Sequence, residues 1–232
     1  MIRPVLIACS HGTSSLDGRD AIRSLVDEVR VLLPSVDVRE AFVDVQEPSV
    51  DDVVAALPPR RPAVIVPLLL STGFHTGVDI ARAARRRDGV VAAPPLGPHD
   101  LLALVLESRL GELGLRDDDA IVLAAAGSSD PRAADDVSAV AERLSRCLSR
   151  LVTVGFAAGC EPRIDAAVGA ARSAGATRVV AASYVLAPGY FADVIRRSGA
   201  DAATSPLGPD PRIAAIVAER YRAAAATLAG AA

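Results

Sequence analysis

Short apolar runs alternate with longer amphipathic stretches along the whole chain. In the first half, the runs of strand length are Val5–Cys9, Val36–Val43, Ala63–Leu70 and Val90–Ala93. The stretches with helical spacing of apolar residues are Asp17–Leu33, Val50–Leu57, Gly77–Arg87 and Asp100–Leu113. Continuous apolar runs are typical of strands buried on both faces, and their alternation with helices predicts a parallel sheet covered on both sides.

The second half repeats this order of elements. Its predicted strands are Ile121–Ala126, Val152–Ala158, Arg178–Leu186 and Asp201–Thr204. Its predicted helices are Arg132–Ser149, Pro162–Ser173, Phe191–Arg197 and Pro211–Leu228. The pattern therefore predicts two similar α/β domains, each a small parallel sheet flanked by helices.

Individual residues support this repeat. Four matches occur in the same order in the two halves: Gly12-Thr13-Ser14 with Gly127-Ser128-Ser129, Glu47-Pro48 with Glu161-Pro162, Gly73-Phe74 with Gly189-Tyr190, and Pro95-Leu96-Gly97-Pro98 with Pro206-Leu207-Gly208-Pro209. We interpret the chain as a tandem duplication with domains 1–116 and 117–232, joined near the polar stretch 116–119. The shared glycines and prolines are typical of turns and helix starts that both copies need for folding.

Three positions differ between the halves in a way that points to chemistry. They are His11 opposite Ala126, Asp44 opposite Ala158, and His75 opposite Phe191. Each polar residue follows a predicted strand, and the carboxyl ends of parallel strands meet at one edge, where open α/β sheets bind ligands. With the first strand between the second and third, two imidazoles and one carboxylate share one space. Such a set suits a divalent ion such as Fe, Co, Ni or Zn and leaves coordination positions open.

Two nearby features favour structural roles. The third histidine, His99, corresponds to Asp210 at the start of the last predicted helix, which favours a helix cap. The loop at Gly12–Ser15 allows an anion cradle at a helix N-terminus or a plain cap. Because Gly127–Ser129 keeps the loop without a histidine, the cap is the simpler interpretation.

Composition excludes several classes of protein. The 232 residues are 51% hydrophobic with a net charge of −3, which argues against a disordered tail and a polybasic nucleic-acid binder. Aromatic residues make up 3% without any Trp, so base-stacking platforms are not expected either. The three cysteines, Cys9, Cys147 and Cys160, have no C-x-x-C spacing, so we expect a reduced, cytoplasmic protein. The apolar runs are too short for a secretion signal or a membrane span.

Three segments resemble the sirohydrochlorin chelatases, a family often called CbiX or SirB. They are Ala8–Ser14, Ala41–Ser49 and Pro67–Ile80. The resemblance extends over nearly the whole chain, because long members of that family are tandem repeats. It implies two class II chelatase-like domains with flavodoxin-like strand order facing a cleft, and insertion of Fe²⁺ or Co²⁺ into sirohydrochlorin on the routes to siroheme or cobalamin. It also implies a monomer that acts as a pseudo-dimer, the second half forming the other wall of the cleft.

The resemblance also assigns residues. The family's two metal-binding and catalytic histidines correspond to His11 and His75, and a carboxylate that some members supply corresponds to Asp44. The usual residue there is Glu, so Asp44 either binds the metal directly or acts through water or a histidine. Because the implied substrate carries several carboxylates, which arginine binds in paired hydrogen bonds, we expect Arg19, Arg82 and Arg132, near the predicted strand-end loops, to contact it together with Gly12 and Gly73. The metal is a substrate, and no permanently bound cofactor is implied.

Aromatic residues of the second half allow two interpretations. Tyr184, Tyr190 and Phe191 either pack against the tetrapyrrole or fill the space of a lost site.

Two other functions compete with the chelatase. A non-catalytic tetrapyrrole or metal carrier would use the same residues without turnover. A phosphohydrolase or phosphomutase with His11 as nucleophile is suggested by the His-Gly pair. That chemistry needs an arginine beside the histidine to hold phosphate, and Ser10 stands there instead.

Overall fold

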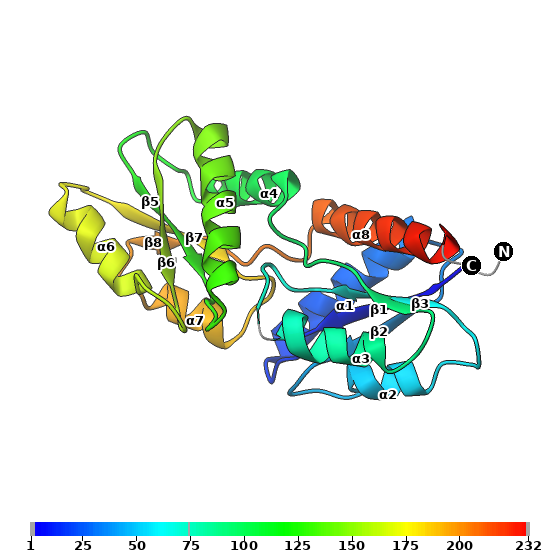
Figure 1. Cartoon of the computed structure of the whole chain (residues 1–232). Coiled ribbons are helices and arrows are strands. Elements are labelled where there is room, and N and C mark those ends of the chain that lie inside the picture. Colours follow the sequence, from blue (N-terminus) through cyan, green and yellow to red (C-terminus); the bar gives the residue numbers. More distant parts are fainter. Residues whose placement is uncertain (1–2, 74, 231–232) are drawn as a thin grey trace. The chain divides into compact units, whose positions relative to one another are not determined.

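The computed structural model describes residues 3–73 and 75–230, without the side chains of 75–77 and 230 (Figure 1). The chain forms two compact units, and each has its own sheet and core. The first unit consists of residues 1–96 and 209–232, and the second consists of residues 97–208. The described residues form two four-stranded sheets with parallel pairing throughout. This confirms the predicted class of two similar α/β domains.

The first unit has the strand order β2-β1-β3-β4. Its strands are β1 (Val5–Ser10), β2 (Val38–Phe42), β3 (Ala63–Pro67) and β4 (Val90–Ala92). Its helices are α1 (Leu16–Leu32), α2 (Val50–Ala55), the π-helix η1 (His75–Ile80), α3 (Ala81–Arg85) and α8 (Pro211–Gly230). Every residue of β1 and β3 is buried, as the unbroken apolar runs predict. The first strand lies between the second and third, which confirms the order on which the convergence of site residues depends.

The second unit repeats this arrangement with the order β6-β5-β7-β8. Its strands are β5 (Ala120–Ala125), β6 (Val152–Phe156), β7 (Val179–Tyr184) and β8 (Ala202–Ala203). Its helices are α4 (Asp100–Glu112), α5 (Pro131–Leu148), α6 (Ile164–Ser173) and α7 (Tyr190–Arg196). The predicted elements therefore all occur, with ends that move by a few residues.

The compact units differ from the expected domains 1–116 and 117–232 by an exchange of helices. Helix α4 comes from the first half of the sequence but packs against α5 of the second unit. Helix α8 comes from the second half but packs against α1 and β3 of the first unit. The apolar stripe of α8, which includes Ile213, Ile216 and Val217, is fully buried there.

Two arginines hold the exchanged helices in place. On α8, Arg220 donates from Nε to the carbonyl oxygen of Pro95 at 3.0 Å. On α4, Arg109 donates from Nη2 to the carbonyl oxygen of Leu207 at 3.3 Å. Both acceptors belong to the repeated Pro-Leu-Gly-Pro turn, so each helix is tied to the turn of the unit that it covers. In the part of the chain that the structure describes, we find no helix with the length and apolar character to cross a membrane.

Candidate functional site

Backbone hydrogen bonds bring the segments after β1 and β2 together. The amide of Val43 donates to the carbonyl oxygen of Ser10 at 3.0 Å, and the amide of Asp44 donates to that of His11 at 3.1 Å. The amide of Leu68, just after β3, donates to the carbonyl oxygen of Cys9 at 2.7 Å. The structure therefore places His11 and Asp44 at the same edge of the sheet, at the carboxyl ends of adjacent strands.

Gly12 allows these two loops to approach each other. Its φ is +91°, and a Cβ atom built there would lie 2.2 Å from the carbonyl oxygen of Asp44. Only glycine fits a site with both a positive φ and so close a contact. The structure gives Gly12 this backbone role, and its expected contact with substrate stays a prediction.

Asp44 begins a tight turn, as an aspartate at the end of a strand commonly does. Its carboxylate Oδ1 accepts from the amide of Val45 at 2.8 Å, and its carbonyl oxygen accepts from the amide of Gln46 at 2.6 Å. The side chain of Gln46 then accepts from the amide of Thr13 at 2.9 Å. These contacts orient an exposed carboxylate beside the loop of His11, and Gln46 is a site residue that no sequence motif signalled.

His11 is half-buried, with its Nδ1 atom 3.3 Å from the carbonyl oxygen of Gly12. An imidazole with its proton on Nδ1 donates to that oxygen and presents the lone pair of Nε2. A hydrogen bond from one ring nitrogen to a carbonyl is the usual way in which proteins fix the tautomer of a metal-binding histidine.

His75 is the first residue of η1, which follows β3, and its side chain lies outside the described residues. Gly73 lies in the segment between β3 and η1. Among the side chains that are described, no group of three His, Cys, Asp or Glu residues could hold a metal ion. The expected set includes His75, so its assembly into a metal site stays a prediction.

Asp79, on η1, is a second residue that sequence reasoning passed over. Burial, and then the negative charge of Asp79, raise the pKa of the Cys9 thiol to about 12. Asp79 also pairs with Arg82, at 3.3 Å between Oδ1 and Nη1. Its spacing of four residues from His75 was the available signal. The Cys9 thiol is therefore protonated near neutral pH.

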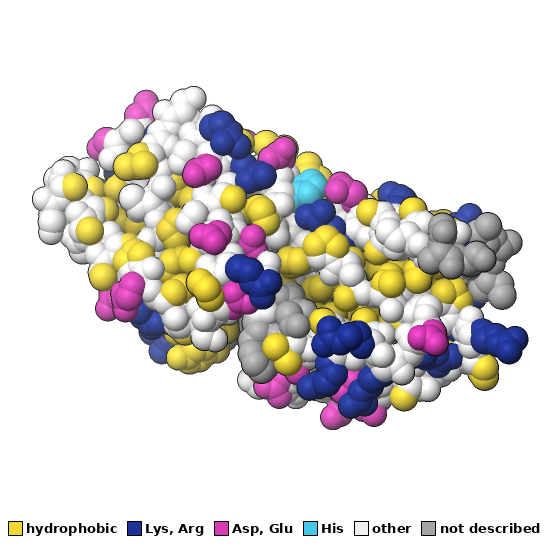
Figure 2. All heavy atoms as spheres, viewed as in Figure 1, with side chains coloured by type: hydrophobic (Ala, Val, Ile, Leu, Met, Phe, Trp, Pro, Cys, Tyr) yellow, Lys and Arg dark blue, Asp and Glu magenta, His cyan; other side chains and the backbone are white. Residues whose placement is uncertain are grey.

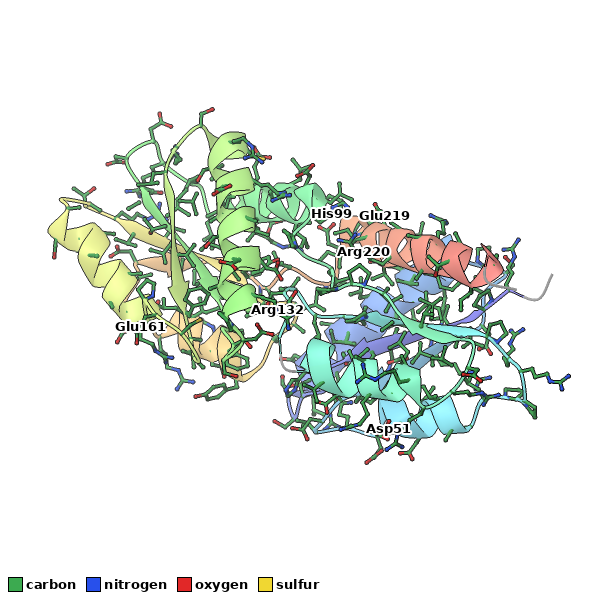
Figure 3. The ribbon with its side chains drawn as sticks, viewed as in Figure 1. Asp51, His99, Arg132, Glu161, Glu219 and Arg220 are labelled. Carbon is green, nitrogen blue, oxygen red and sulfur yellow. The ribbon has the colours of Figure 1, made fainter. Side chains whose placement is uncertain are left out.

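The three predicted substrate arginines contact groups of the protein itself. Arg19 donates from Nε to the carbonyl oxygen of Thr13 at 2.9 Å, so it supports the loop that carries His11. Arg82 pairs with Asp79 and, at 3.3 Å, with Asp51, which Figure 3 labels near the start of α2. Figure 2 shows basic side chains gathered over α3 with acidic ones beside them.

Arg132 belongs to the other unit. It lies in the first turn of α5 and pairs with Asp130 at 2.7 Å (Figure 3). Hydrogen bonds from Arg132 lower the pKa of the Asp130 carboxyl. Of the three arginines, Arg19 is the one that contacts the loop carrying His11, although it lies on α1 itself.

The second unit keeps the same backbone frame without the ligand-type side chains. The amides of Ala157 and Ala158 donate to the carbonyl oxygens of Ala125 and Ala126, both at 2.8 Å. Gly127 has a φ of +86°, and a Cβ atom there would lie 1.8 Å from the carbonyl oxygen of Ala158. The fold therefore needs the glycine and the paired loops, but it does not need His11 or Asp44.

His99 has the structural role that its position predicts. Its Nδ1 atom accepts from the amide of Leu101 at 3.1 Å and caps α4. The corresponding Asp210 accepts from the amide of Arg212 at 2.9 Å, at the start of α8. This confirms the helix cap.

The structure places the aromatic residues of the second unit in different surroundings. Tyr184 is buried in β7, and this burial raises the pKa of its hydroxyl. It therefore fills the interior of the unit and offers no surface to a ligand. Tyr190 is exposed at the start of α7, where its ring meets that of Phe191 edge to face, with 5.3 Å between the centroids.

Comparison with known proteins identifies the class first. The fold matches SirB from Bacillus subtilis with Fe³⁺ at a TM-score of 0.83 and 21% identity, over 99% of this chain and 98% of that chain. It also matches CbiX, the terminal enzyme for biosynthesis of siroheme in denitrifying bacteria, at a TM-score of 0.68 and 20% identity, over 95% of this chain and 99% of that chain. The two parallel sheets, with a histidine and a carboxylate at one strand edge, thus define a protein with the chelatase fold.

The sequence comparisons give the family. A sirohydrochlorin ferrochelatase from Priestia megaterium is 24% identical over 204 residues, which cover 83% of this chain and 76% of the relative. The CbiX family model matches residues 5–113 and 120–224, one match to each repeat. This chain belongs to the CbiX family.

Proposed function

We propose that this protein inserts a divalent metal, Fe²⁺ or Co²⁺, into sirohydrochlorin, as a chelatase of siroheme or cobalamin biosynthesis. The observation that carries the proposal is the difference between two equivalent backbone frames. Both units have the paired loops after their first two strands, but only the first has His11 and Asp44 on them. Membership of the CbiX family supports the choice of a tetrapyrrole and a metal as substrates.

His11 and His75 are proposed to hold the incoming ion. Imidazole is a good ligand for both iron and cobalt, and three protein ligands leave positions open for the nitrogens of the macrocycle. The contact between Nδ1 of His11 and the carbonyl oxygen of Gly12 supports binding through Nε2. Asp44 completes the set, either as a ligand or through a water molecule.

Insertion also releases protons. The free-base macrocycle loses two pyrrole N–H protons when its four nitrogens bind a divalent ion. Imidazoles accept protons near neutral pH, so one of the two histidines is proposed to take one pyrrole proton as it gives up the metal, and the second proton passes to solvent water. The carboxylate of Asp44 stabilises the resulting imidazolium by its negative charge.

The substrate itself carries several carboxylates, which guanidinium groups bind in pairs of hydrogen bonds. Arg19, Arg82 and Arg132 are proposed to contact them, together with the backbone at Gly12 and Gly73. Arg82 and Arg132 would then exchange their present carboxylate partners for those of the substrate.

We also propose that the chain works as a monomer, because one chain contains both repeats. The free thiols of its three cysteines support a reducing compartment such as the cytoplasm.

The test is an anaerobic insertion assay with sirohydrochlorin and either Fe²⁺ or Co²⁺. The wild type is expected to remove the free-base absorption bands catalytically, and His11→Ala and His75→Ala to lose most of this activity while remaining folded. His99→Asn is the matched control, because asparagine also caps helices and the substitution removes an imidazole that caps α4 of the second unit. Stoichiometric binding without turnover would identify a carrier instead. Phosphate release from a monoester that His11→Ala abolishes would identify a phosphohydrolase.

A further inference from the structure

Val45 has a backbone conformation that its residue type disfavours. Its φ is +60°, in the left-handed region, where the branched Cβ of valine crowds the backbone. The side chain is 52% exposed, so it contributes little to the core. Neither local conformation nor packing accounts for a valine at this position.

The other unit has glycine in this turn, where a Cβ atom would also lie 2.7 Å from the backbone of Ser128. Gly159 occupies the corresponding position with a φ of +77°. The two turns have the same hydrogen bond, from Gln46 to the carbonyl oxygen of Asp44 in one unit and from Cys160 to that of Ala158 in the other. The fold therefore accepts glycine here, and the valine occurs only in the unit that carries His11 and Asp44.

Other exposed apolar residues lie at the same edge of the first sheet. Leu16 begins α1, which follows β1, and is 72% exposed. Val78 lies in η1, which follows β3, and is 42% exposed. Val45 follows β2, so each of these three adjacent strands leads to an exposed aliphatic side chain beside the candidate metal site.

We propose that Val45 contacts one face of the tetrapyrrole and holds it against the metal site, with Leu16 and Val78 flanking the contact. The inference rests on the proposed function. A macrocycle that takes a metal held by His11 and Asp44 lies against the loop after β2, where Val45 follows Asp44. Burial of the isopropyl group against that face stabilises the complex. The tight turn fixes the backbone of Val45, and the fixed backbone in turn holds the direction of the side chain.

Two substitutions separate the apolar contact from the backbone strain. Val45→Thr keeps the branched shape and replaces a methyl group by a hydroxyl, so the Kd for metal-free sirohydrochlorin is expected to rise about fivefold. Val45→Gly removes the side chain and the strain together. It is expected to weaken macrocycle binding at least as much, and to raise the midpoint of thermal unfolding by about 2–4 °C. Val45→Ile is expected to retain tight binding.

Val31 offers a matched control, because it is another valine, 78% exposed, near the end of α1. Val31→Thr is expected to leave macrocycle binding unchanged. Binding is measured by absorption titration without metal, and Co²⁺ affinity is measured separately on the same variants. If the wild type binds and turns over the macrocycle, and Val45→Thr and Val45→Gly bind it equally well, the inference about Val45 is overturned and the proposed function stands. Absence of both binding and turnover in the wild type would overturn the proposed function.

Discussion

The carbonyl oxygen of Asp44 occupies the space where a side chain at Gly12 would begin, since a Cβ atom there would lie 2.2 Å away. This contact joins the loop of one candidate ligand to the loop of another. The distance between His11 and Asp44 is therefore set by a backbone contact that tolerates glycine alone. The second unit repeats this relationship, since a Cβ atom built on Gly127 would lie 1.8 Å from the carbonyl oxygen of Ala158.

Gly12→Ala and Gly127→Ala should therefore destabilise the protein alike but differ in their effect on activity. Each forces an alanine into a positive φ and against a carbonyl oxygen, which costs about 2–4 kcal/mol of the free energy of unfolding. Gly12→Ala should also abolish metal insertion at temperatures where the protein stays folded, because it displaces Asp44. Urea denaturation and insertion assays measure the two effects. If both variants lost metal insertion equally, the loop contact of the first unit would have no special role in the reaction.

The similarity of the two frames also predicts that a metal site can be transplanted. In the triple variant Ala126→His, Ala158→Asp and Phe191→His, the second unit carries the residues of the first at corresponding positions. Because the backbone hydrogen bonds match, we expect this variant to bind a second equivalent of Co²⁺. A cobalt titration followed by absorption measures the stoichiometry, with Ala158→Asp alone as the control. A folded triple variant that binds no additional cobalt would show that a matching backbone with these three side chains does not suffice to form a metal site.

Much of the fold could be predicted from the sequence because the strands are continuous apolar runs and because the repeat gives each element a second copy. The order of the first three strands is the flavodoxin-like order that the family resemblance implies, and the convergence of His11 and Asp44 depends on that order. The exchange of α4 and α8 could not be predicted in the same way. The apolar stripe of α8 indicates that one face is buried, but it does not indicate which sheet covers it.

Two details of the candidate site could not be predicted from the sequence, for a different reason. The turn at Val45 and the bond from Thr13 to Gln46 depend on backbone angles and on contacts between residues far apart in the chain. Neither side chain belongs to a type that suggests chemistry. Comparison of the two repeats still held a signal at Val45, since a valine that replaces the glycine of the other copy is unexpected in a turn.

The cysteines are predicted to differ strongly in reactivity. Cys9 is fully buried, and burial together with the charge of Asp79 raises the pKa of its thiol to about 12. Its reactive thiolate is therefore nearly absent at pH 8. Cys147 is exposed, so maleimide should label it within minutes and label Cys9 only after unfolding. Peptide mass spectrometry of the labelled protein measures the order, and fast labelling of Cys9 in the folded protein would contradict its burial.

Asp201 is predicted to stabilise the second unit in a pH-dependent way. A hydrogen bond from the amide of Val179, at 2.7 Å, and one from Arg172 lower the pKa of its carboxyl. A lowered pKa means that the folded state favours the ionised form. The stabilisation is therefore complete above the unfolded pKa of about 4 and is lost as the pH falls through the folded value. Asp201→Asn should be less stable than wild type at pH 7, and the two should converge in strong acid. Denaturant titrations across this range measure the difference, and a gap that is constant with pH would exclude an ionic origin.

The exchange of helices predicts which fragments fold alone. A fragment of residues 97–208 contains β5–β8 together with α4, whose buried Leu102, Val105 and Leu106 pack within that unit. It should therefore show a cooperative thermal transition. A fragment of residues 117–232 follows the sequence repeat instead, so it lacks α4 and carries α8 without the strands that α8 covers. Because both changes expose apolar surface, this fragment should bind a hydrophobic dye and unfold without a sharp transition. Circular dichroism and dye fluorescence on the two fragments test the prediction, and the opposite result would mean that each terminal helix folds onto the sheet of its own repeat.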